Sequence, residues 1–166
     1  MTDKNYVLAF DTANEVIAVG LGRLCAKSGT VEEVAVLRVE AHRASNTRLL
    51  PEVDQLMTAA GVAREQLACV AVGRGPGSFT GVRIAMATAK GVASALGVAL
   101  VGLSSLDAVA WNAWAAGQRG QLLVVADAMR REVYPVFYSL TDDGACRNSE
   151  DTVEKAQDFA DRLAEM

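Results

Sequence analysis

The segment Gly73-Arg74-Gly75-Pro76-Gly77-Ser78-Phe79-Thr80-Gly81-Val82-Arg83 lies between two apolar stretches of this chain. The stretch before it, residues 67–73, is a short apolar run that predicts a buried strand. The stretch after it, residues 78–96, has the length and composition of a helix. Glycines around Pro76 allow backbone conformations that other residues rarely adopt. We therefore predict a tight loop between a strand and a helix, a junction on which α/β folds depend.

Three strands and one helix are predicted before this loop. The apolar runs that predict the strands are residues 6–10, 16–24 and 31–39, and their short connections indicate an antiparallel meander. Apolar residues then recur at helical spacing from Ser45 to Ala60. Pro51 conflicts with that pattern, so the helix either starts near Leu50 or is kinked at Pro51.

After the loop, strands and helices alternate. We predict a strand at 98–103, a helix at 105–116, strands at 121–127 and 132–140, and an amphipathic helix from Thr152. The order βββαβαβα is the pattern of a ribonuclease-H-like α/β domain with a mixed sheet. The final ββα resembles the opening of a second copy. We expect a first domain at residues 1–103 and the start of a second, truncated domain at residues 104–166.

Composition narrows the classes of function. With 166 residues and an apolar fraction of 51%, the chain can bury a core and is not intrinsically disordered. Its net charge of −4 argues against its binding nucleic acid alone. Three cysteines that lie far apart predict neither a zinc ribbon nor a disulfide framework. The first apolar run is too short for a signal peptide or a membrane span, so a cytoplasmic location with no membrane association is expected.

The glycine-rich loop fits no general nucleotide motif. A P-loop needs a lysine after its second glycine, and the spacing of the dinucleotide-binding fingerprint is absent as well. Two readings remain: a structural turn, or an anion site at the start of the helix, where Ser78 or Thr80 can act as cap. The residues of the possible anion site are Gly75, Gly77, Ser78, Thr80 and Gly81.

The sequence GRGPGSFTGVRI at residues 73–84 resembles the signature of the TsaB (YeaZ) family. Residues 8–21, 47–53, 104–106 and 127–134 also resemble family segments in the same order, so the similarity covers about the first 140 residues. The resemblance implies the fold of the actin-like, Hsp70-like and sugar-kinase group, built from two ribonuclease-H-like halves. Two positions depart from the family pattern, which often has a histidine where Ser45 stands and an arginine where Met129 stands.

The same resemblance argues against catalysis. The related catalytic subunit, TsaD, holds a metal through two histidines four residues apart, whereas this chain has one histidine, His42. We expect no metal, no cofactor and no metallopeptidase activity. Asp11 lies in an Asp-Thr turn that lacks the glycine of actin-like phosphate loops, so ATP hydrolysis by this chain alone is not expected. A carboxylate site of Asp11, Asp107 and Asp127 is disfavoured, because Asp107 falls in a predicted helix as a solvated or capping residue.

The helix at 78–96 is apolar nearly all round, which predicts burial on more than one side. The small residues allow close approach of a second helix, but burial inside its own domain is the alternative. The resemblance implies pairing with TsaD through the first two helices. The interface residues that follow are Leu49, Leu50, Val53, Met57, Val82, Arg83, Met86, Ala89, Lys90 and Ala93.

The function implied is that of a non-catalytic scaffold or activator in the complex that forms N6-threonylcarbamoyladenosine beside the anticodon of tRNA. Its expected partners are TsaD and the ATPase TsaE, with tRNA reached only through the complex and a homodimer formed when the chain is alone. A small actin-like kinase or ATPase and a homodimeric interaction module are the alternatives.

Overall fold

The computed structural model describes residues 4–40 and 45–165. The chain divides into two compact units, Met1–Leu103 and Ser104–Met166. Each unit has its own apolar core.

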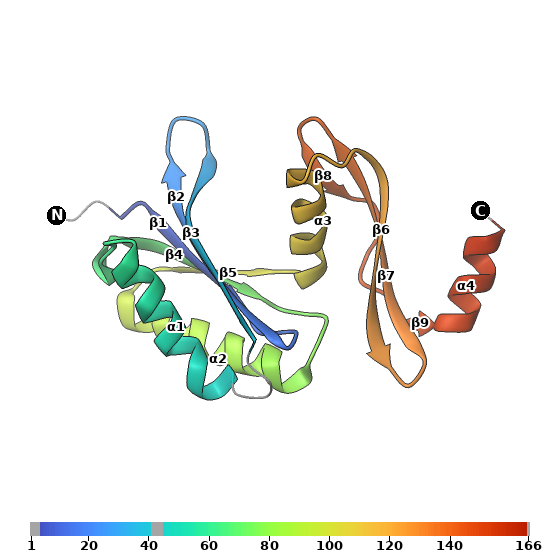
Figure 1. Ribbon diagram of the computed structural model, residues 1–166, viewed down its shortest axis with the longest axis horizontal. Helices are drawn as coiled ribbons and strands as arrows, with labels where there is room; N and C mark the ends of the chain where they lie inside the picture. The colour runs from blue at the N-terminus through green and yellow to red at the C-terminus, as the bar shows by residue number, and fades with distance from the viewer. Residues whose placement is uncertain (1–3, 41–44, 166) are drawn as a thin grey trace. The chain divides into compact units, whose positions relative to one another are not determined.

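A five-stranded sheet forms the centre of the first unit (Figure 1). The strands are β1 (Tyr6–Asp11), β2 (Val16–Cys25), β3 (Thr30–Glu40), β4 (Leu67–Gly73) and β5 (Ala99–Leu103). Their order across the sheet is β3-β2-β1-β4-β5. The first three pair antiparallel, whereas β4 runs parallel to both β1 and β5. The predicted meander and mixed sheet are confirmed, and β4 has the bounds predicted from its apolar run.

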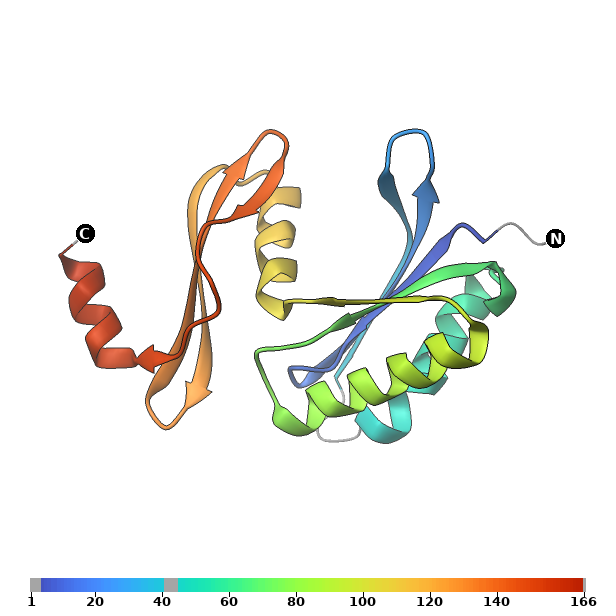
Figure 2. The ribbon, with the colours of Figure 1, turned by 180° about the vertical axis from the view of Figure 1, so that it is seen from behind.

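Two helices, α1 (Ser45–Ala59) and α2 (Phe79–Leu96), cover one face of this sheet, and a short 3-10 turn, η1 (Arg64–Gln66), leads into β4 (Figures 1 and 2). Alternate strand residues such as Leu8 and Phe10 are buried beneath the helices, as the period of a strand requires. Helix α1 starts at Ser45, as its apolar spacing predicts, and continues through Pro51. Of the two alternatives at Pro51, a start of the helix near Leu50 is therefore wrong. The position of His42 lies outside the described residues.

The second unit has a four-stranded antiparallel sheet with a helix on each face. Its elements are α3 (Ser105–Ala115), β6 (Gly120–Met129), β7 (Glu132–Thr141), β8 (Gly144–Arg147), β9 (Glu154–Lys155) and α4 (Ala156–Ala164). Helix α3 packs on a core that includes Val136 and Tyr138. Phe159 of α4 makes an edge contact with Phe137, ring centroids 6.4 Å apart. Because neighbouring strand residues point to opposite faces, α4 lies on the other face from α3.

The last part of the chain differs from the sequence prediction. Strands β8 and β9 were not predicted, and α4 starts at Ala156 rather than at Thr152. The helix α4 starts later in the sequence than predicted because Glu154 and Lys155 pair with Val133 and Glu132 of β7. Across residues 4–40 and 45–165, no helix is both long and apolar enough to cross a membrane.

Candidate functional site

The glycine-rich loop joins β4 to α2, as predicted. Ser78 is the N-cap of α2, and its Oγ accepts a hydrogen bond from the Gly81 backbone N–H at 3.2 Å, which satisfies one of the unpaired donors of a helix start. Thr80 lies instead within the first helical turn. The Gly75–Pro76 peptide bond is cis. The Ser78 backbone N–H donates to the Ala13 carbonyl oxygen at 2.6 Å, so the loop is bound to the turn between β1 and β2.

Two glycines of this loop allow that turn to approach closely. A Cβ atom on Gly81 would overlap the carbonyl oxygen of Thr12, and one on Gly77 would overlap the carbonyl oxygen of Ala13. The buried Thr12 hydroxyl, 1% exposed, donates to the Gly81 carbonyl oxygen at 2.6 Å. Both glycines are therefore required by contacts inside the chain. Binding of an anion by the loop stays a prediction.

Asp11, at the end of β1, lies beside the start of the glycine-rich loop. Its Oδ1 accepts a hydrogen bond from the Ala13 backbone N–H at 2.6 Å, the geometry of an Asx turn. Its carboxylate occupies the space where a Cβ atom on Gly73 would lie, because the carboxyl ends of the parallel strands β1 and β4 meet at one edge of the sheet. The structure supports the reading of Asp11 as a turn residue.

The other two candidate carboxylates are engaged separately. Oδ1 of Asp127 accepts a hydrogen bond from the Met129 backbone N–H at 2.7 Å. Oδ1 of Asp107 accepts one from the Tyr138 hydroxyl at 2.8 Å and lies 3.0 Å from Nε of Arg147. The reading of Asp107 as a solvated or capping residue is therefore wrong. In the described part of the chain, no three His, Cys, Asp or Glu side chains gather as metal ligands.

Arg147 connects the helix and strands of the second unit. Its Nη2 lies 2.7 Å from Asp151 and donates to the Tyr138 hydroxyl at 3.4 Å and to Ser104 Oγ at 3.3 Å. Its Nε is a buried donor that forms an ion pair with Asp107 without the geometry of a hydrogen bond. Burial raises the pKa of Tyr138 to about 12; Asp107 adds to this effect and the hydrogen bond from Arg147 opposes it. The hydrogen bond to Asp151 raises the pKa of Arg147.

The residues predicted for a partner interface separate into two groups. The first group is buried in the core of the first unit and offers no side-chain surface to a partner: Leu49, Val53, Met57, Ala89 and Ala93. On α2 the buried face is a stripe at four-residue spacing, of Gly81, Ala85, Ala89 and Ala93. The second group is half-buried or exposed: Leu50, Val82, Arg83, Met86 and Lys90. Of the predicted interface residues, only this second group, on the outer faces of α1 and α2, has side-chain surface that a partner could contact.

The outer face of α2 carries an exposed aromatic residue and several small residues. Phe79 is 69% exposed, and the guanidinium of Arg83 lies 3.6 Å from the centroid of its ring, a cation–π contact. Ala87, Gly91 and Ala95 follow at four-residue spacing and are exposed. A Cβ atom on Gly91 would meet nothing within 4 Å. This face is open to the approach of a second helix.

Sequence comparison places the chain among known proteins. Residues 35–164 match the model of a family described as TsaD, tRNA N6-adenosine threonylcarbamoyltransferase. The chain is also 33% identical over 161 residues to the tRNA threonylcarbamoyladenosine biosynthesis protein TsaB of Escherichia coli. The matched region covers 96% of this chain and 67% of that protein. The chain belongs to the TsaB (YeaZ) family.

The chain is also similar to other TsaB-family proteins. The TsaB of Haemophilus influenzae is 34% identical over 128 residues, 77% of this chain and 51% of that protein. The solved structure of YeaZ from Pseudomonas aeruginosa superposes with a TM-score of 0.79 at 32% identity, over 90% of this chain and 67% of that one. The chain thus spans between about half and two thirds of these TsaB-family relatives. The likeness to YeaZ confirms the predicted fold class.

Two residues at which the sequence departs from the TsaB pattern have defined positions. Ser45 is buried at the first position of α1. Met129 ends β6 and is 69% exposed.

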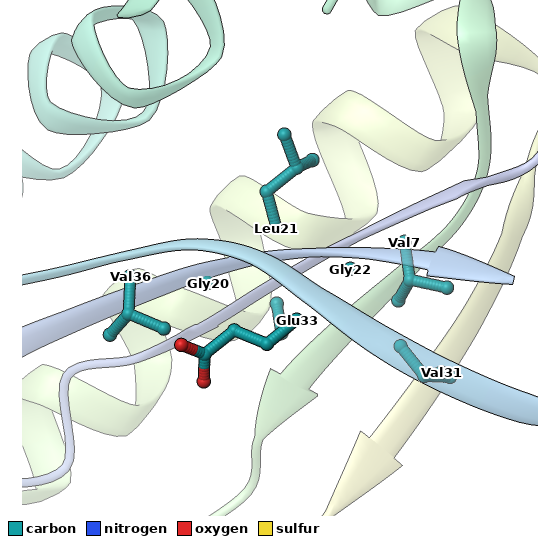
Figure 3. Close-up of a pocket in the computed structure, with 8 residues that line it drawn as sticks. Val7, Gly20, Leu21, Gly22, Val31, Glu33 and Val36 are labelled. Carbon is teal, nitrogen blue, oxygen red and sulfur yellow. The ribbon is translucent and has the colours of Figure 1, made fainter. Parts of the chain in front are cut away.

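The sheet face opposite α1 and α2 in this TsaB-family unit carries a shallow apolar depression of about 210 Å³ (Figure 3). Gly20 and Gly22 form its floor, with Val7 and Val36 beside them, and Glu33 supplies a charged group among its lining residues. Leu21 points instead towards the helices (Figure 3). A site for a small ligand normally combines an enclosed apolar pocket with several converging polar groups, and this depression lacks that combination.

Proposed function

We propose that this chain is a non-catalytic subunit that pairs with a TsaD-type subunit in the formation of N6-threonylcarbamoyladenosine in tRNA. The observation that carries the proposal is the identity of 33% over 161 residues to a protein named for the biosynthesis of that nucleoside. The match of residues 35–164 to the TsaD family model supports a subunit that is itself related to TsaD.

The non-catalytic role is supported by the residues at the junction of β1, β4 and α2. In that junction the carboxylate of Asp11 is hydrogen-bonded to the Ala13 backbone, and the glycines accommodate the backbone of Thr12 and Ala13. A phosphate-binding loop needs glycines whose N–H groups face the ligand. Here the glycines instead leave room for the turn between β1 and β2, which packs against them. This arrangement favours a subunit without ATPase or kinase activity over the alternative of a small actin-like kinase. The sequence has one histidine, His42, and therefore lacks the histidine pair that the family resemblance implies for the metal site of TsaD.

The pairing surface we propose is the outer face of α1 and α2. Leu50 on α1 is 54% exposed and Phe79 on α2 is 69% exposed, while the small residues around Gly91 let a helix approach closely. Exposed aromatic residues and arginines such as Arg83 are enriched where proteins bind each other. The same face would form a two-fold homodimer when the partner is absent, because a symmetric interface uses one patch twice.

The remaining partners follow from this pairing. With a net charge of −4, the chain would reach tRNA as part of the complex rather than alone. The ATPase TsaE would bind the assembled pair.

Reconstituted tRNA modification tests the proposal. The TsaD-type subunit of the same organism would be assayed with threonylcarbamoyl-adenylate and tRNA, in the presence and absence of this chain. We expect modification to depend on the chain, and Asp11→Asn to support it as long as that variant is folded. Equal modification without the chain would overturn the proposed role. Modification by the chain without TsaD would overturn its non-catalytic nature.

A further inference from the structure

The hairpin between β6 and β7 has an unusual backbone. Met129 pairs with Glu132, so Arg130 and Arg131 form a two-residue loop. Met129, Arg130 and Arg131 have φ values of 65°, 53° and 66°. Three consecutive residues with side chains therefore occupy the left-handed region.

This conformation conflicts with the residues that adopt it. Two-residue hairpin loops with positive φ at both central positions strongly prefer Asn-Gly, because other L-residues place Cβ too close to the backbone. Arg130 and Arg131 are neither Asn nor Gly. Residues held in such a region are stabilised by their surroundings, and here the Arg131 carbonyl oxygen accepts a hydrogen bond from the Ala156 backbone N–H at 2.9 Å. Residues that adopt an unfavourable backbone conformation often serve a function, and here this suggests a function for the side chains of Arg130 and Arg131.

Both arginines are exposed. Within residues 4–40 and 45–165, neither forms an ion pair. Two carboxylates near the loop have other contacts: Glu154 forms an ion pair with Arg162 at 2.7 Å, and Oδ1 of Asp127 accepts a hydrogen bond from the Met129 N–H. Lys155, paired with Glu132 in the neighbouring strand, adds an exposed cation beside the loop.

We propose that the loop of Arg130 and Arg131 binds the phosphate backbone of RNA; this inference rests on the proposed function in tRNA modification. A guanidinium presents paired N–H donors that match the geometry of phosphate oxygens. A two-residue loop holds the two groups at the end of a rigid hairpin. The acidic net charge of the chain explains why these contacts act together with a partner rather than alone.

The double variant Arg130→Asn, Arg131→Gly tests this inference, because it installs the preferred loop residues and removes both charges. We expect its Tm to rise by about 3–6 °C through relief of backbone strain. In complex with the TsaD-type subunit, it should bind the tRNA substrate with a dependence of log K on log salt concentration that is shallower by about 1.4–1.8, from two lost phosphate contacts. A control variant with Lys27→Gln and Arg64→Gln, which removes two exposed charges from the first unit, should leave that slope unchanged.

Several results would overturn the inference. A double variant that assembles with TsaD but binds tRNA with the slope of the wild type would show that the loop does not contact phosphate. A double variant that no longer assembles would show that the arginines bind a carboxylate-rich protein surface instead. Failure of the unmodified chain to assemble with TsaD would overturn the proposed function first, and the inference with it.

Discussion

Substitution of Gly81 by Ala tests how the glycine-rich loop is packed. Gly81 lies in the first turn of α2, and its new Cβ would overlap the carbonyl oxygen of Thr12, far inside the separation of about 3.5 Å at which such atoms attract each other. Because Thr12 is buried at 1% exposure, its backbone cannot simply move into solvent. The turn and the helix must separate, and the hydrogen bond from Thr12 Oγ1 to the Gly81 carbonyl oxygen, 2.6 Å long, is then strained.

The expected loss of stability follows from these contacts. Overpacking costs about 1–3 kcal/mol, and a weakened buried hydrogen bond costs about 1 kcal/mol more. The higher helix propensity of alanine returns up to about 1 kcal/mol. We expect a net decrease of about 2 kcal/mol in the free energy of unfolding of the first unit.

Gly91→Ala is the matched control in the same helix. A Cβ atom on Gly91 meets nothing within 4 Å, so this change should stabilise the unit by up to about 1 kcal/mol. Both tryptophans, Trp111 and Trp114, lie in the second unit. Amide hydrogen exchange of β1 and β4 in urea is therefore the appropriate assay, because it reports on the first unit. If the Gly81 variant were as stable as the Gly91 variant, the packing of the loop described above would be refuted.

Three further predictions concern the second unit and the pairing surface. The folded protein raises the pKa of Tyr138 from 10.0 to about 12. The contribution of the protonated Tyr138 to stability is therefore fully present below pH 10 and is lost as the pH rises through about 12. Tyr138→Phe should remove this alkaline loss, measured as the free energy of unfolding at several pH values. Asp107→Asn breaks the ion pair with Arg147 at 3.0 Å and should lower the free energy of unfolding by about 1 kcal/mol at low ionic strength, with a smaller effect in 1 M salt; an effect independent of salt would contradict that origin. Gly91→Leu should leave the fold intact but weaken pairing with TsaD at least tenfold in calorimetric titration, whereas Ala164→Leu on the exposed surface of α4 should leave pairing unchanged; equal affinities for the two variants would remove α2 from the interface.

Much of the first unit could be predicted because its signals are local. The apolar run Leu67–Gly73 is a strand with the predicted bounds, and Ser78 caps α2 as its position suggests. At Pro51 the sequence left open a helix start near Leu50 or a kink, and the start near Leu50 is wrong because this exposed proline lies in the second turn of α1.

The prediction failed where distant residues decide the structure. Asp107 contacts Tyr138 and Arg147, which lie 31 and 40 positions later in the sequence, and no local pattern indicates such partners. Strand β8 is four residues long and starts at Gly144, which has a φ of 144° and lies against the ring of Trp111. A run of that length carries no periodic signal.

The two faces of α2 could not be distinguished from sequence. Small and apolar residues surround the helix, so the pattern indicated burial on more than one side without showing which side meets the sheet. The structure shows that Ala89 and Ala93 pack inside the unit, although both were predicted to contact a partner. Arg83 and Lys90 are exposed on α2, and their contact with a partner stays a prediction.

The most direct test of the central claim is the mass of the species that this chain forms with the TsaD-type subunit of its own organism. The two proteins would be purified separately, mixed at micromolar concentration and analysed by size-exclusion chromatography with light scattering. We predict a one-to-one complex, and a homodimer when the chain is analysed alone. Elution of the two proteins as separate species, each with the mass it has alone, would contradict the proposed role as a TsaD partner.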